Sequence, residues 1–293
     1  MAPALLGPNE PPPYEILNAD AMRPLLLVCE HASRRVPDQL HGAYPETLLE
    51  THYGCDIGTE PLIRQLAEAL GARAVIARYS RIVIDCNRRL DDPTLLLADS
   101  DLGPIAANSA LSEAERQARV DDIYVPFHAA VARELRELST GLSSPVYVAI
   151  HSFTPELTGS ARPWDMGVMW DADPRLAQRL HEALHREPGI LIGDNEPYSG
   201  KYAADFSVDF HAERAGLANV AIEIRQDHLR TAAGVSAWAV RLATALDELA
   251  RAPDLAHPLA ARPAADFEKE AGLIAAADQA RLGAHEGGSR YGG

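Results

Sequence analysis

Residues 25–31 have the sequence Leu25-Leu-Leu-Val-Cys-Glu-His31, in which a continuous apolar run is followed at once by an acid and a histidine. A short apolar run bounded by a proline and by charged residues is typical of a strand that is buried on both faces. Two later runs are similar, because residues 146–150 precede His151 and residues 220–224 contain Glu223. These runs predict core strands that carry polar groups at or near their ends.

Helical patterns alternate with these strands along the chain. Residues 61–70 place apolar side chains on one face and end at Gly71, which can stop a helix. Ser112 and Glu115 form a capping box ahead of a long helix that Pro126 should kink or split. Further strands are predicted at residues 74–77, 82–84 and 166–170, and further helices at residues 174–185 and 235–249.

The alternation of strands and helices predicts an α/β fold of three layers, in which helices flank a mostly parallel, mixed central sheet. A chain of 293 residues, 47% of them hydrophobic, can form one such domain, which we predict over residues 21–252. Residues 1–20 are proline-rich and are expected to form a flexible arm without regular structure. Residues 253–293 are rich in alanine and glycine and are expected to form a loosely ordered tail with one loose helix.

Composition limits the classes of partner. The formal net charge of −15 argues against nucleic acid and against an anionic membrane surface. No run of eighteen apolar residues is present, so no membrane span is expected. The first residues lack the pattern of a secretory signal, and the three cysteines suit a reducing compartment. We therefore expect a cytoplasmic protein.

The polar residues near the strand ends predict a metal site, because ligands of open α/β sheets bind beyond the carboxyl ends of the strands. A catalytic zinc takes about three ligands from His, Asp and Glu, and His31 and His151 supply two. Asp56, in a glycine-flanked turn, is the favoured third ligand, since Glu30 and His31 would point to opposite faces of a strand. Glu30 and Ser33 remain as alternative or supporting residues.

Each candidate also has a structural explanation. A histidine after a strand is often a hydrogen-bonded structural residue, and Asp56 could simply cap the helix that follows it. The pair Asn87-Arg88 could clamp a loop. A Glu at position 223 of a core strand is costly to bury unless it is paired or functional, and Arg225 on the same face could pair with it.

Six segments together resemble one family: Cys29-Glu-His-Ala-Ser33, His52-Tyr-Gly-Cys-Asp56, Asp85-Cys-Asn-Arg88, His151-Ser-Phe-Thr154, Asn195-Glu-Pro-Tyr-Ser199 and Glu223-Ile-Arg-Gln-Asp227. Their order and spacing, over most of the chain, are similar to those of the N-formylglutamate amidohydrolase family. The resemblance implies a zinc-dependent exopeptidase-like (phosphorylase/hydrolase-like) fold. It also implies hydrolysis of N-formyl-L-glutamate, or of a related N-acyl amino acid, to formate and glutamate, as in histidine degradation.

The resemblance also assigns roles to residues. His31 and His151 match the ligands of Zn²⁺ or another divalent metal, and Glu223 matches the catalytic glutamate. Asn87 and Arg88 match a pair that docks a substrate carboxylate.

We further expect Arg225 to assist in holding the carboxylates of a small anionic substrate, and Tyr198 to close over the site.

The sequence departs from the patterns of related enzymes at two places. His31-Ala-Ser-Arg34 lacks the His-x-x-Glu of zinc carboxypeptidases, so the acidic ligand must come from elsewhere. Glu30-His-Ala-Ser33 replaces the Pro-His-Ser-Gly of housekeeping deformylases. This difference points to a subgroup of the family that acts on another N-acyl amino acid.

Two other functions are compatible with the sequence. A cysteine-dependent amidase would use Cys29, Cys55 or Cys86 together with His31, and it needs an exposed, activated thiolate. A non-catalytic protein that binds acyl amino acids or metal would keep Arg88 but would not need Glu223.

Overall fold

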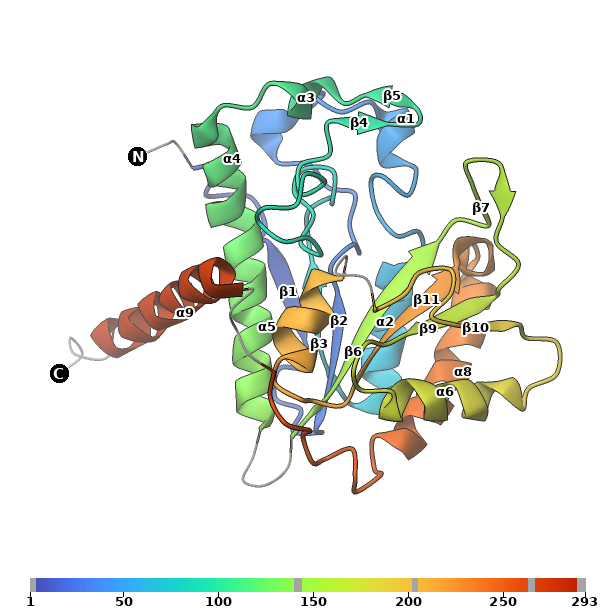
Figure 1. The fold of residues 1–293 in the computed structure, drawn as a ribbon. Helices are drawn as coiled ribbons and strands as arrows, with labels where there is room; N and C mark the ends of the chain where they lie inside the picture. The colour runs from blue at the N-terminus through green and yellow to red at the C-terminus, as the bar shows by residue number, and fades with distance from the viewer. Residues whose placement is uncertain (1–3, 140–143, 202–204, 263–266, 289–293) are drawn as a thin grey trace.

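The computed structural model describes residues 4–139, 144–201, 205–262 and 267–288. Its central sheet has seven strands in the order β1-β3-β2-β6-β11-β9-β10 (Figure 1). The strands are β1 Tyr14–Leu17, β2 Leu25–Cys29, β3 Arg73–Ala77, β6 Val146–Phe153, β9 Met166–Met169, β10 Ile192–Asp194 and β11 Asn219–Arg225. Neighbours β3, β2, β6 and β11 run parallel, whereas β1 and β9 are antiparallel to their neighbours β3 and β11. The predicted mixed, mostly parallel sheet is therefore confirmed.

Helices cover both faces of this sheet and make the three layers (Figure 1). On one face, α2 Thr59–Leu70, α6 Arg175–His185 and α8 Ala232–Leu249 pack on one another and on the strands. On the other face, α5 Val125–Leu138 packs on β2 and β3, and α9 Glu268–Gly288 packs outside α5. The shorter helical segments are α1 Glu46–Leu49, α3 Ala106–Ser109, α4 Glu113–Arg119, α7 Phe206–Val208, the 3₁₀ turns η1 Asp38–Leu40 and η4 Gln226–Leu229, and the π-helical turns η2 Val120–Tyr124 and η3 Asp209–Glu213.

Several local predictions are confirmed. Gly71 ends α2 with a φ of 56°, in the left-handed region where glycine is favoured. Ser112 and Glu115 form the reciprocal capping box of α4. The long helix is split as Pro126 requires, because η2 separates α4 from α5 and the proline lies in the first turn of α5.

Two predictions about strands are wrong. Residues 82–84 are buried but form a turn, in which the amide of Val83 donates to the carbonyl of Ser80 at 3.0 Å. Strand β6 does not end at Ile150 but continues to Phe153, because its partner β11 extends beside it to Arg225. His151 is thus a strand residue and does not follow the strand.

The two ends of the chain contain more structure than their composition suggests. Strand β1 pairs with β3 in register from Tyr14 to Leu17, although prolines precede it. In the tail, Ile274 of α9 is buried, and Glu270 accepts a hydrogen bond from the amide of Leu90 at 2.9 Å.

Two hairpins, β4 Asp99–Ser100 with β5 Gly103–Pro104 and β7 Glu156–Leu157 with β8 Ser160–Ala161, lie apart from the main sheet. Every helix in the described ranges is too short or too polar to cross a lipid bilayer.

A buried histidine pair between the sheet and α5 should make stability depend on pH. His128 Nδ1 lies 3.0 Å from His211 Nε2, and burial lowers the pKa of His128 to about 4. This pKa lies below the value of about 6.5 in the unfolded chain, so acid favours unfolding as the pH falls through this window. Between pH 7 and pH 5, the titration of His128 should lower the free energy of unfolding by about 2 kcal/mol. We expect the free energy of unfolding of His128→Asn, measured in urea, to fall less between pH 7 and pH 5 than that of wild type. An equal fall in the two proteins would contradict this expectation.

Candidate active site

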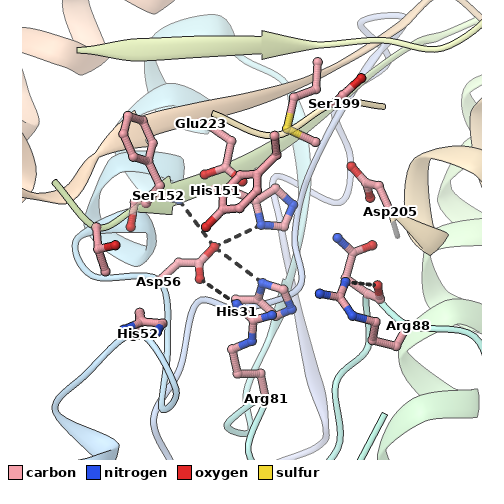
Figure 2. Close-up of a pocket in the computed structure, with 15 residues that line it drawn as sticks. His31, His52, Asp56, Arg81, Arg88, His151, Ser152, Ser199, Asp205 and Glu223 are labelled. Carbon is pink, nitrogen blue, oxygen red and sulfur yellow. Dashed lines mark hydrogen bonds and ion pairs between the residues drawn. The ribbon is translucent and has the colours of Figure 1, made fainter. Parts of the chain in front are cut away.

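A pocket lies at the carboxyl ends of β2, β6 and β11 (Figure 2). Its cavity has a volume of about 140 Å³ and opens to solvent. Its lining comes from segments that are far apart in the sequence and include His31, Asp56, Arg88, His151, Tyr198 and Glu223. The fold therefore brings most of the predicted site residues into one cavity.

The pairing of β6 with β11 places His151 and Glu223 side by side. The two residues are direct partners in the parallel register, so their side chains leave the same face of the sheet. Their neighbours Ile150, Ile222 and Ile224 point to the opposite face, into the core beneath α2 and α8. This alternation anchors both strands while leaving the imidazole and the carboxyl group on the pocket side.

His31, Asp56 and His151 form a buried cluster in this pocket. Asp56 Oδ2 lies 3.0 Å from His151 Nδ1 and 3.4 Å from His31 Nδ1, and Figure 2 shows both contacts. One possible ligand atom from each residue lies within 4.8 Å of the other two, and within the described ranges His31 Nδ1 has no hydrogen-bond partner. Two imidazoles and a carboxylate are a donor set that zinc uses, so these residues fit a divalent cation.

A second carboxylate lies behind each imidazole. His31 Nε2 lies 2.6 Å from Asp85 Oδ1, and His151 Nε2 lies 3.3 Å from Glu30 Oε2. Carboxylates in this position fix the orientation and the tautomer of a metal-binding histidine. Glu30 is on the far side of His151 from Asp56, so the geometry favours Asp56 as the acidic ligand and Glu30 as the residue that orients His151.

Arg81 joins two of the carboxylates. Its guanidinium lies 2.7 Å from Asp85 Oδ2 and 3.2 Å from Asp56 Oδ1. Burial alone would raise the pKa of Asp56, but the charges and hydrogen bonds of His31, His151 and Arg81 hold it well below its usual range. Burial alone would lower the pKa of His151, but its hydrogen bonds with Asp56 and Glu30 raise it well above its ordinary value.

The position of Asp56 is set by the turn before α2. Gly58 adopts a φ of 82°, and any side chain there would collide with Leu229. The backbone amide of Asp56 donates to the carbonyl of His31 at 2.9 Å, which ties the turn to the end of β2. Helix α2 has no side-chain cap, so the alternative that Asp56 caps this helix is wrong.

Glu223 is buried, and no ion pair to its carboxyl group is present among the described residues. In the part of the chain that the structure describes, its Oε2 atom has no hydrogen-bond partner, and burial raises the pKa of the carboxyl group to about 8. The alternative pair with Arg225 is wrong, because the Arg225 guanidinium lies 3.2 Å from Asp165 and 2.8 Å from Asp227. An unpaired buried carboxyl group is costly, so its presence here indicates a functional role.

Only some of the other predicted site residues line the pocket. Asn87, Arg88 and Tyr198 line the pocket, whereas Arg225 and Ser33 do not. Asn87 is fixed by the amide of Ser207, which donates to its Oδ1 atom at 2.9 Å.

Sequence reasoning missed further residues in the pocket and next to it. Asp85 and Arg81 hold the histidine cluster, and His52 and Asp205 line the cavity. Asp205 Oδ1 is buried and has no hydrogen-bond partner among the residues that the structure describes. The motif containing Asp85 was visible in the sequence, but its contact with His31 depends on the turn at residues 82–84 that was predicted as a strand.

None of the three cysteines lines this pocket. Burial raises the pKa of Cys29 to about 12 and that of Cys55 to about 11, and it raises the pKa of Cys86 well above its usual value. A cysteine nucleophile needs a thiolate near neutral pH, so the structure argues against a cysteine-dependent amidase.

Known proteins resemble this chain in sequence and in fold. An N-formylglutamate deformylase of Pseudomonas putida is 30% identical over 218 residues, which cover 67% of this chain and 80% of the relative. A solved structure of a gene product from Agrobacterium tumefaciens is 34% identical, covers 84% of this chain and 97% of its own, and has a TM-score of 0.79. An N-formylglutamate amidohydrolase structure from Ralstonia eutropha shares the fold at 19% identity, with a TM-score of 0.62 over 81% of this chain and 97% of its own.

The family profile of N-formylglutamate amidohydrolase matches residues 23–230, which span β2, β6, β11 and every residue of the pocket described above. The chain therefore belongs to the N-formylglutamate amidohydrolase family.

Proposed function

We propose that this protein hydrolyses the amide bond of N-formyl-L-glutamate, or of a closely related N-acyl amino acid, to release the acid and the free amino acid. One observation carries the proposal: the unpaired, buried Glu223 lies beside His151 at a cluster of residues that fits a divalent cation. The deformylase relatives supply the substrate class.

His31, Asp56 and His151 would hold the metal, with zinc the first candidate. Asp85 and Glu30 orient the two imidazoles from behind, and Arg81 keeps Asp56 and Asp85 in place. A cation bound there would polarise the amide carbonyl and make a water more acidic.

The residues of the chain then supply positioning and proton transfer. Glu223 accepts a proton from the attacking water and returns it to the leaving nitrogen, so that a neutral amine departs. Burial raises the pKa of this carboxyl group to about 8, so near neutral pH both the ionised form, which accepts the proton, and the protonated form, which donates it, are populated. Asn87 and Arg88 bind the α-carboxylate of the substrate, and Tyr198 forms one wall of the cavity.

Arg88→Lys tests the carboxylate site, because lysine keeps the charge but loses the bidentate fork. We expect kcat/KM to fall about 10-fold or more for N-formylglutamate, since hydrogen bonds to charged groups are worth about 1.5–3 kcal/mol. The loss should be small for the α-amide of the same substrate. Steady-state kinetics on both compounds measures this, and equal losses would show that Arg88 is structural.

The proposed function is tested by a turnover screen of N-acyl amino acids, with and without added zinc. Formate and glutamate should appear in equal amounts from N-formylglutamate, and faster than products from N-formyl derivatives of neutral amino acids. Tight binding without turnover would identify the protein as a non-catalytic binder and contradict the proposal.

A further inference from the structure

Arg162 lies beside the wall of the pocket, a few residues beyond the strand that carries His151. Strand β6 leads directly into the hairpin of β7 and β8, and Arg162 follows β8 at the root of this hairpin. Its backbone amide donates to the carbonyl of Pro155 at 2.8 Å, which closes the hairpin. The position of Arg162 is therefore fixed relative to the residues at the end of β6.

The side chain of Arg162 is held against the pocket wall. Nη1 donates to the hydroxyl of Tyr198 at 2.8 Å, and the guanidinium lies 4.7 Å from the centre of the Tyr198 ring. The same nitrogen lies 3.5 Å from Thr154 Oγ1, and the guanidinium lies 5.9 Å from the centre of the Phe153 ring. Tyr198, Thr154 and Phe153 all line the cavity, so three of its wall residues position this one cation.

The charges around the cavity leave Arg162 available for a ligand. Arg81 is committed to Asp56 and Asp85, and burial lowers the pKa of His52, which keeps this imidazole neutral. Among the described residues, no carboxylate forms an ion pair with Arg162, although the chain has 42 acidic residues and 27 basic ones.

The proposed substrate carries two carboxylates on the amine side of the scissile bond, and Arg88 with Asn87 accounts for one of them. We infer that Arg162, held by Tyr198 and Thr154, binds the second, side-chain carboxylate and so makes the site specific for N-acyl derivatives of dicarboxylic amino acids. This inference rests on the proposed function and assigns the role that the sequence suggested for Arg225. A cation beside Tyr198 suits a carboxylate at the end of a flexible side chain, because the other end of the substrate would be held at the metal cluster.

The test compares N-formyl-L-glutamate with N-formyl-L-glutamine, which has nearly the same shape but no side-chain charge. Arg162→Gln should lower kcat/KM for the glutamate substrate about 10- to 100-fold and change that for the glutamine substrate little. Tyr198→Phe, which removes the hydroxyl that holds Arg162, should reduce the preference for glutamate partially. Arg230→Gln removes the same charge from an exposed residue outside the pocket lining and should leave the preference unchanged.

Equal losses on the two substrates in Arg162→Gln would overturn the inference and leave the proposed function intact. Binding of the product L-glutamate, measured by calorimetry, gives a readout that does not need turnover. Glutamate should bind wild type about 10- to 100-fold more tightly than Arg162→Gln, and equal affinities would also overturn the inference. Absence of turnover of both substrates by wild type would instead contradict the proposed function itself.

Discussion

Replacing Glu223 with glutamine is expected to lower kcat by about 10²–10⁴-fold, the usual effect of a positioned acid–base group. Glutamine keeps the shape of the side chain and cannot accept the proton of the attacking water. Metal content should be retained, because Glu223 is not one of the three clustered residues that would hold the metal.

The stability of this variant separates catalysis from a structural role. Among the described residues, Glu223 has no ion pair and no hydrogen bond at Oε2, so exchanging the carboxyl group for an amide breaks no such contact and should leave the melting temperature unchanged or slightly raised. Near-normal turnover with a melting temperature several degrees lower would show that the carboxyl group serves the fold, and another base would be needed. Glu182→Gln, at an exposed position of α6, is a matched control that should change neither property.

Replacing His151 with alanine is expected to remove most of the metal and most of the activity. His151 lies between the carboxylates of Asp56 and Glu30, and it would provide one of three ligands. Loss of a residue that merely supports a ligand costs about 10- to 100-fold in metal affinity, so loss of the ligand itself should cost at least as much. Elemental analysis of the purified variant measures this directly.

Two controls keep the His151 result interpretable. Circular dichroism should show that the variant is folded, and His151→Gln offers a second variant that retains a hydrogen-bonding group between the two carboxylates. His185→Ala removes an exposed histidine on α6 and should leave metal content unchanged. Full metal content in both His151 variants would remove His151 from the proposed ligands.

The fold was largely predictable because its core strands and helices carry strong local signals. The run at β2 is buried throughout, and α2, α6 and α8 follow their apolar stripes closely. The strand predicted at residues 82–84 failed because three apolar residues can equally well be buried in a turn. Strand β1 was missed because Tyr14–Leu17 is stabilised mainly by pairing with β3, which no local pattern shows.

The clearest predictions of site residues came from polar residues that lie in or next to a buried apolar run. His31, His151 and Glu223 were identified as candidates because polar residues beside buried apolar runs stand out in the sequence. Asp85 and Arg81 were missed because their role depends on contacts with His31 and Asp56, which are distant along the chain. Arg225 was misplaced for a related reason: its neighbours Asp165 and Asp227 bind it outside the pocket.

The most direct test is a metal titration of chelator-treated protein, with N-formylglutamate as the substrate. We expect the metal-free protein to be inactive and formate release to rise linearly with added zinc up to about one equivalent, as for a single site with three protein ligands. The His151 and Glu223 variants would then separate metal binding from proton transfer. Turnover of N-formylglutamate at the full rate by metal-free wild type would contradict the account.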